Sequence, residues 1–266
     1  MTTPTITVVL DPLVPSTAAI RWAVREAARR QANLRIAMPA DHGRDDADTA
    51  AKIAASADAE LLVVAGPARD ADELVMRAYC PVVIVPDQLP ERRRLRPGRA
   101  VRPRDPRPVV VAAGPTTEPE VIAFAEAAER RANLLAVRTW SEPLISLGLG
   151  LVLSDRVDRW DESDGHNRED LSQQLSIYRL AYPDVAVEQL VVNTPCADRL
   201  AELAQRARLL VLGRPARGAL LNGLAASPAI TLARRVPCPV VIVPPPGQVR
   251  SSWWPRRRVG LADLRG

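Results

Sequence analysis

Cys-Pro-Val-Val-Ile-Val-Pro stands at residues 80–86 and again, without a change, at residues 238–244. Such an identity is very improbable by chance in a chain of 266 residues, so the sequence contains two copies of one domain. Two further pairs of segments repeat: AARRQANL at 27–34 with AAERRANL at 127–134, and LLVVAGPAR at 61–69 with LLVLGRPAR at 209–217. This internal duplication fixes the architecture before any single motif is considered.

The distance between matching segments grows along the chain. It is 100 residues for the first pair (127 − 27), 148 for the next (209 − 61) and 158 for the closing heptapeptide (238 − 80). The first copy therefore lacks 48 residues in its middle (148 − 100) and 10 before its last strand (158 − 148). The missing middle corresponds to a long helix at 168–182 and an additional strand at 185–192 in the second copy. In a sheet ordered 3-2-1-4-5 the third strand lies at the edge, so the remaining strands stay paired when it is lost.

Short runs rich in Val, Ile and Leu alternate with helical patterns in both copies. This alternation predicts βαβ units, and the nearly continuous apolar content predicts strands covered on both faces. The fold class is thus α/β, with a doubly wound parallel sheet in each copy. The predicted strands are 6–10, 34–38, 61–65 and 82–85 in the first copy, and 109–113, 134–137, 185–192, 209–212 and 240–243 in the second.

The first helix, capped by Ser16 or Thr17, shows how one face is assigned from spacing. Apolar residues recur at helical intervals, whereas four arginines are predicted to face water. The apolar set is Ile20, Ala23, Val24 and Ala27, and the arginines are Arg21, Arg25, Arg29 and Arg30.

The composition is that of a globular protein, with 47% hydrophobic and 25% charged residues. No apolar run approaches the ~20 residues that a membrane-spanning helix needs, and the first residues lack the basic start of a signal peptide. The three cysteines, Cys80, Cys196 and Cys238, form no CxxC pair. A reducing cytoplasm is the predicted location.

The net charge of +5 comes from the connections rather than the domains. Residues 87–107 carry eight Arg against three acidic residues, and residues 247–266 carry five Arg against one, which leaves about −4 for the rest (5 − 5 − 4). No specific nucleic-acid partner is therefore predicted. The tail motif Trp253-Trp254-Pro255 followed by Arg256–Arg258 favours either weak contact with an anionic surface or packing of the tryptophans onto the fold.

In order and spacing, the segments together resemble a tandem member of the universal stress protein family, of the type found in actinobacteria. The resemblance rests on Val8-Val9-Leu10-Asp11-Pro12, Arg21-Trp22-Ala23, Tyr182-Pro183-Asp184-Val185, the strand ending at Gly213, and the closing heptapeptide. It implies two flavodoxin-like (Rossmann-like) domains. Their expected bounds are 1–88 for a truncated domain, 89–107 for an Arg/Pro-rich linker, 108–246 for a complete domain and 247–266 for a basic tail.

The resemblance also implies ATP or AMP at the carboxyl ends of the strands of the second copy. Family members that bind ATP carry Gly, two residues, Gly, nine residues, then Gly-Ser or Gly-Thr, because glycines let backbone N–H groups approach phosphates. Placed on this chain, the site comprises Gly114 at the family's acidic position, Val137 at the neighbouring strand end, and Gly213, Ala216, Arg217, Gly218, Ala226 and Ser227 in the loop.

The loop of the second copy departs from that pattern. Alanine replaces two of the glycines, at Ala216 and Ala226, and glycine replaces the carboxylate at Gly114. The first copy keeps Asp11 but has no such loop. We therefore expect a degenerate nucleotide site. Ser227, followed by Pro228, also reads as an ordinary helix N-cap, and Asp11 as a turn residue.

Three functions remain open at this level. The first is a non-enzymatic binding or regulatory protein of the stress response, the second a switch that binds ATP or AMP, and the third an adenylyl-transfer or hydrolytic enzyme. The chain lacks a paired His motif and a Walker lysine, which disfavours the enzyme. Cys80 and Cys238 read as buried side chains, and His42 and His166 as surface residues. Because family members pair their last strands between subunits, 82–85 and 240–243 are expected to pair within the chain; a homodimer stays open.

Overall fold

The computed structural model describes residues 3–10, 16–38, 49, 52–53, 55–66, 68, 71–87, 89, 105–139, 153–193, 196–214, 228–245 and 248. The first half contains β1 (Thr5–Val9), α1 (Thr17–Arg30), β2 (Asn33–Ala37), β3 (Leu61–Ala65), α3 (Ala71–Arg77) and β4 (Val82–Val85). The second half contains β5 (Val109–Ala112), α4 (Glu118–Arg130), β6 (Leu134–Thr139), α5 (Leu153–Ala181), β7 (Val187–Val192), α6 (Cys196–Ala204), β8 (Leu209–Gly213), α7 (Pro228–Arg235) and β9 (Val240–Val243).

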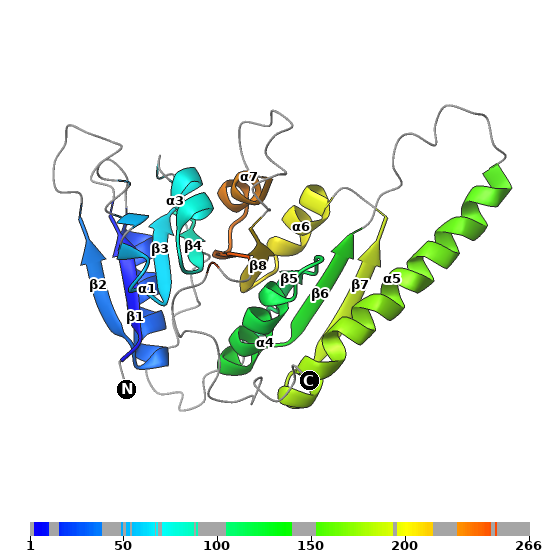
Figure 1. Ribbon diagram of the computed structural model, residues 1–266, viewed down its shortest axis with the longest axis horizontal. Helices are drawn as coiled ribbons and strands as arrows, with labels where there is room; N and C mark the ends of the chain where they lie inside the picture. Colours follow the sequence, from blue (N-terminus) through cyan, green and yellow to red (C-terminus); the bar gives the residue numbers. More distant parts are fainter. Residues whose placement is uncertain are drawn as a thin grey trace.

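All the strands join one sheet, in the order β2-β1-β3-β4-β9-β8-β5-β6-β7 (Figure 1). Neighbours are parallel except β4 and β9, which pair antiparallel with Val83 opposite Val241. The expected strand content is confirmed: β1–β4 form the shorter half, and the longer half has the 3-2-1-4-5 order with β7 as its edge. The pairing of the two closing strands within the chain is confirmed as well. The expected domain bounds fall in or beside residues that are not described, and they stay predictions.

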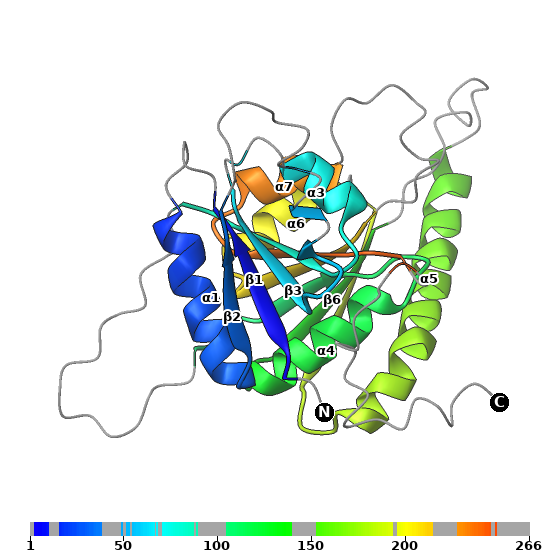
Figure 2. The ribbon, with the colours of Figure 1, turned by 60° about the vertical axis from the view of Figure 1, so that its left-hand side comes forward.

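Helices cover both faces of this sheet. Residues of α1, α4 and α5 pack into one apolar core. Residues of α3, α6 and α7 pack into the other, and Figure 2 shows these helices grouped together. Strands β3, β4 and β9 are buried along their whole length, as expected for strands between two helical layers. The long helix α5 starts at Leu153, earlier than the predicted residue 168.

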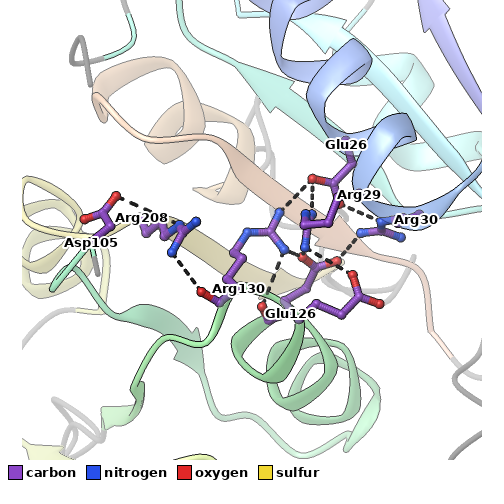
Figure 3. A network of polar contacts seen from close by, with 8 residues as sticks. Glu26, Arg29, Arg30, Asp105, Glu126, Arg130 and Arg208 are labelled. Atoms are coloured by element: carbon purple, nitrogen blue, oxygen red, sulfur yellow. Dashed lines mark hydrogen bonds and ion pairs between the residues drawn. The ribbon is translucent and has the colours of Figure 1, made fainter. Parts of the chain in front are cut away.

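Two predictions about α1 are wrong. Val24, assigned to the apolar face of the helix, is 48% exposed, because the second half's cover of the matching position is missing here. Arg29 and Arg30 do not face water, because they lie between α1 and α4 in a cluster of six charged side chains (Figure 3). Glu26 accepts from Arg130 at 3.0 Å and from Arg30 at 2.6 Å. Arg30 in turn pairs with Glu126, and Arg29 reaches Glu129 at 3.1 Å. Each half donates to the other, so the cluster joins the two copies.

The cluster is symmetric because it is built from repeated residues. Glu26 and Arg30 match Glu126 and Arg130 at the offset of 100, and the contacts Arg30–Glu126 and Arg130–Glu26 are reciprocal. Burial disfavours the charged carboxylate of Glu26, but the arginines around it outweigh burial and lower its pKa to about 2. The two halves are thus held by charges as well as by the β4–β9 ladder.

Candidate functional site

The candidate site lies where β5, β6 and β8 end. Gly213 is the last residue of β8, Val137 lies in β6, and Gly114 follows β5. The backbone N–H of Ala113 donates to the carbonyl of Val137 at 2.8 Å, which ties the ends of β5 and β6 together. The structure therefore brings these three expected residues together at the carboxyl ends of neighbouring strands, as the doubly wound topology requires.

Gly213 sits close to the start of α4. A Cβ at Gly213 would lie 3.3 Å from Cγ of Pro119, closer than side chains ordinarily pack. A glycine at this position thus lets the end of β8 approach α4.

Gly114, which stands at the family's acidic position, has the opposite surroundings. A Cβ built there meets no described atom within 4 Å, so the backbone leaves room for a larger side chain. Its carbonyl accepts a hydrogen bond from Nε2 of Gln174 at 3.2 Å. With respect to the described residues, Gly114 therefore has free space on its side-chain side, whereas its carbonyl is hydrogen-bonded.

Gln174 links this loop to a polar network that the sequence did not reveal. Its Nε2 also donates to Oε1 of Glu120 at 3.2 Å, and its Oε1 accepts from Arg138. Arg138 lies 3.8 Å from Asp170. These residues come from α4, β6 and α5, and no local pattern connects them.

Glu120 is fully buried, at 0% exposure. Burial raises its pKa to about 7, although nearby backbone N–H groups and Arg138 act in the opposite direction. Its second oxygen, like one oxygen of Glu118, has no hydrogen-bond partner among the described residues. Both glutamates lie in the first turn of α4, where they complement the helix dipole.

Glu120→Gln is expected to stabilise the protein increasingly as the pH rises. The folded pKa of Glu120 lies above its ordinary value of 4.5, so the stability that this group contributes is complete below pH 4.5 and is lost as the pH rises through about 7. Glutamine removes that loss, and the difference in unfolding free energy should grow by roughly 2–3 kcal/mol between pH 4.5 and pH 8. Urea unfolding at several pH values measures it. Glu188→Gln, at an exposed site, is the control; equal pH profiles for both variants would contradict the assignment.

On the other side of Gly213, Arg214 crosses to the first half. Its Nη1 donates to the carbonyls of Val75 and Ala78 at 2.9 and 3.1 Å, where α3 ends, although the residue is only 8% exposed. Its backbone N–H donates to Val243 at 2.7 Å, just as Gly66 donates to Val85 in the first half. A buried cation thus caps α3 next to Gly213, and no pattern in the sequence predicts this contact.

Five expected site residues lie outside the described residues, namely Ala216, Arg217, Gly218, Ala226 and Ser227, as does Asp11. Cys80 and Cys238 are buried as predicted, and burial raises the pKa of each thiol to about 12, far from the range of a reactive thiolate. His166 is an exposed side chain, as predicted. Within the described ranges no cluster of His, Cys, Asp or Glu is arranged to hold a metal. No helix in that part of the chain is long and apolar enough to span a bilayer.

Comparison with known proteins agrees with the fold. The model of the universal stress protein family matches residues 106–244, slightly more than half of the chain. Universal stress protein Rv2623 of Mycobacterium tuberculosis is 28% identical over 173 residues, which are 64% of this chain and 52% of that protein. Universal stress protein Rv1996 of the same species is 37% identical over 153 residues, 54% of this chain and 43% of that protein.

The chain spans about half the length of the curated relatives it matches. Among solved structures, a functionally unknown protein from Pseudomonas aeruginosa PAO1 superposes with a TM-score of 0.52 at 14% identity, over 93% of this chain and 94% of that one. That likeness concerns the fold. The doubly wound halves define an α/β protein. By the family match, the chain belongs to the universal stress protein family.

Proposed function

We propose that this protein is a non-enzymatic binding or regulatory protein of the stress response whose nucleotide site is degenerate. The observation that carries the proposal is the state of Gly114. A carboxylate is missing at a position with room for one, and the loop carbonyl there is hydrogen-bonded to Gln174 instead. The second half therefore keeps the frame of a nucleotide site without the acidic group expected to hold the ligand.

Charge supports the same reading. Glu118 and Glu120 stand in the first turn of α4, and the ring of Pro119 between them is the group nearest to Gly213. Glu118, which is not fully buried, places a carboxylate in the first turn of α4, a helix end that otherwise attracts anions such as phosphate. In the sequence, Ala216 and Ala226 replace the loop glycines, and each methyl group obstructs access to backbone N–H groups.

The side chains also argue against catalysis. Glu26 is engaged with arginines in a cluster between the two halves, and both buried thiols are held neutral by burial. Free thiols at Cys80, Cys196 and Cys238 fit the reducing cytoplasm as its location.

The alternative is a switch that binds ATP or AMP through the second half. Gly213 favours it, because the close approach of β8 to α4 is retained, and Ser227 retains the hydroxyl of the family pattern. Under this alternative Val137, Arg217 and Gly218 would belong to the same nucleotide site. The two functions differ in affinity, which can be measured.

In calorimetry, the unmodified protein is expected to show no binding of ATP or AMP with a dissociation constant below about 100 μM. The triple reversion Gly114→Asp, Ala216→Gly, Ala226→Gly should tighten binding at least roughly tenfold, because the carboxylate and the backbone N–H groups become available again. Adding Ser227→Ala to the triple variant should weaken it again. Micromolar binding by the unmodified chain, abolished by Ser227→Ala alone, would instead establish the switch.

A further inference from the structure

The first half exposes a surface that is buried in the second half. At the offset of 100, Val24 of α1 matches Phe124 of α4, which is 0% exposed. The ring of Phe124 lies 5.5 Å from that of Tyr178 and 5.9 Å from that of Tyr182, at the end of α5. Val24 has no such cover and is 48% exposed. The residues missing from the first half are those that would have formed this cover.

The neighbouring strand β2 shows the same loss. Its counterpart β6 pairs with β7 along six residues, from Leu134–Val187 to Thr139–Val192. Leu134 and Ala136 are fully buried there, whereas Ile36 of β2 is 52% exposed and Met38 is 72% exposed. No described residue pairs with the outer edge of β2. β2 and β7 are opposite ends of the sheet, so this edge is far from the nucleotide frame (Figure 1).

The backbone of β2 is set to accept another strand. Asn33 N–H donates to Pro4 at 2.7 Å and the Ala37 carbonyl accepts from Leu10 at 3.0 Å, so these residues direct their polar groups toward β1. In a parallel ladder alternate residues point the other way, which leaves the N–H and C=O of Leu34 and Ile36 at the free edge. An exposed edge of this kind is a template for strand addition.

Charge around this surface selects the partner. The docking face, defined as Val24, Leu34, Ile36 and Met38, is bordered by the exposed Arg21 and Arg35. Glu26, the acidic residue of α1, is buried in the cluster with Arg30 and Arg130. Among the described residues the border is therefore basic, and an acidic partner fits it.

A second copy of the chain fits poorly. If two β2 edges paired antiparallel through Leu34 and Ile36, the two-fold axis would pass at Arg35 and place it opposite its own counterpart. Like charges directly opposite each other destabilise a strand pair. We infer that the docking face binds an acidic helix–strand segment of a partner protein, with the strand parallel to β2 and an apolar helix face across Val24 and Ile36.

The cover of the second half provides a probe. A labelled synthetic peptide of residues 164–193 contains the end of α5 and all of β7, and its net charge is −3 (two Arg against five Asp and Glu). We expect it to bind the full chain with a dissociation constant below about 100 μM by fluorescence anisotropy. Hydrogen exchange should show new protection of the Leu34 and Ile36 amides, and a scrambled peptide should not bind.

Three variants divide the contributions. Ile36→Pro removes the outward N–H without touching the bonds to β1, and Arg35→Glu reverses the border charge; each should weaken binding at least tenfold. Val24→Glu should do the same by disrupting the helix contact. The matched control is Leu180→Glu in the full chain, at a residue of α5 that is 84% exposed. This variant should bind the unchanged peptide with the same affinity as the original chain. Thermal melts of all variants verify that they fold.

The inference fails under any of three results. The first is that the peptide binds with a dissociation constant above about 1 mM or not at all. The second is that the Ile36→Pro and Arg35→Glu variants fold and bind the peptide with unchanged affinity. The third is that the Leu34 and Ile36 amides are already protected from exchange in the free chain. The last result would mean that this chain or a second copy covers the edge, which light scattering would distinguish.

Discussion

Glu26→Gln is expected to lower the free energy of unfolding by about 3 kcal/mol. The carboxylate is 4% exposed and lies among Arg29, Arg30 and Arg130, whose charges it balances together with Glu126 and Glu129. Glutamine leaves the buried arginines in excess. Because uncompensated buried charge costs more than a lost surface pair, the effect should far exceed that of an exposed ion pair. Urea unfolding at neutral pH measures it.

Glu129→Gln is the matched control, since that side chain is 45% exposed and should change stability by less than about 0.5 kcal/mol. Arg130→Met added to Glu26→Gln should restore part of the loss, because charge balance returns. The pH gives an independent check. The folded pKa of Glu26 is about 2, below its ordinary 4.5, so its contribution is present above pH 4.5 and disappears as the pH falls toward 2. Equal losses for Glu26→Gln and Glu129→Gln would contradict the role of the cluster.

Val83→Asp is expected to unfold the protein or to cost at least about 4 kcal/mol. Val83 is 0% exposed and faces Val241 at the centre of the β4–β9 ladder, where the two halves meet. A carboxylate there has neither water nor a partner charge. Circular dichroism and urea unfolding measure the loss.

The control for Val83→Asp is Leu180→Asp, an equally large change of polarity at an exposed site. It should leave the unfolding midpoint within about 0.5 kcal/mol of the original. If Val83→Asp folded with unchanged stability, the antiparallel junction would not be the structural centre described here.

Duplication made the fold predictable to an unusual depth. The offsets of 100 and 148 predict the missing edge strand, and the family resemblance adds the pairing of Val82–Val85 with Val240–Val243. The start of α5 did not follow. Residues 153–167 are mostly polar, so no apolar stripe announces the helix there.

The misplaced arginines show a different limit. In an isolated domain, helical spacing places Arg29 and Arg30 on the side of α1 that faces solvent. Their burial depends on α4 of the other half, which brings Glu126 and Glu129 against them. The repeated Ala-Ala-x-Arg segment could have indicated this burial. At an interface between two copies related by a two-fold axis, a residue of one copy contacts the residues around the equivalent position in the other copy.

The candidate site was predicted in part. The gathering of Gly114, Val137 and Gly213 follows from strand order, and the structure places them together. The Glu120–Gln174–Arg138 network could not be predicted from the sequence, because its members come from α4, α5 and β6 and their spacing shows no pattern. The same holds for Arg214, whose contacts lie 136 and 139 residues earlier in the chain.

Mass spectrometry of the small molecules released when the purified protein is denatured tests the central claim most directly. The claim is that the second half keeps the strand arrangement of a nucleotide site but has lost the affinity for the nucleotide. We expect no adenine nucleotide above trace amounts from the unmodified chain, and ATP or AMP in recoverable amounts from the triple reversion at positions 114, 216 and 226. Release of ATP or AMP from the unmodified chain in a ratio near one per molecule would contradict the account.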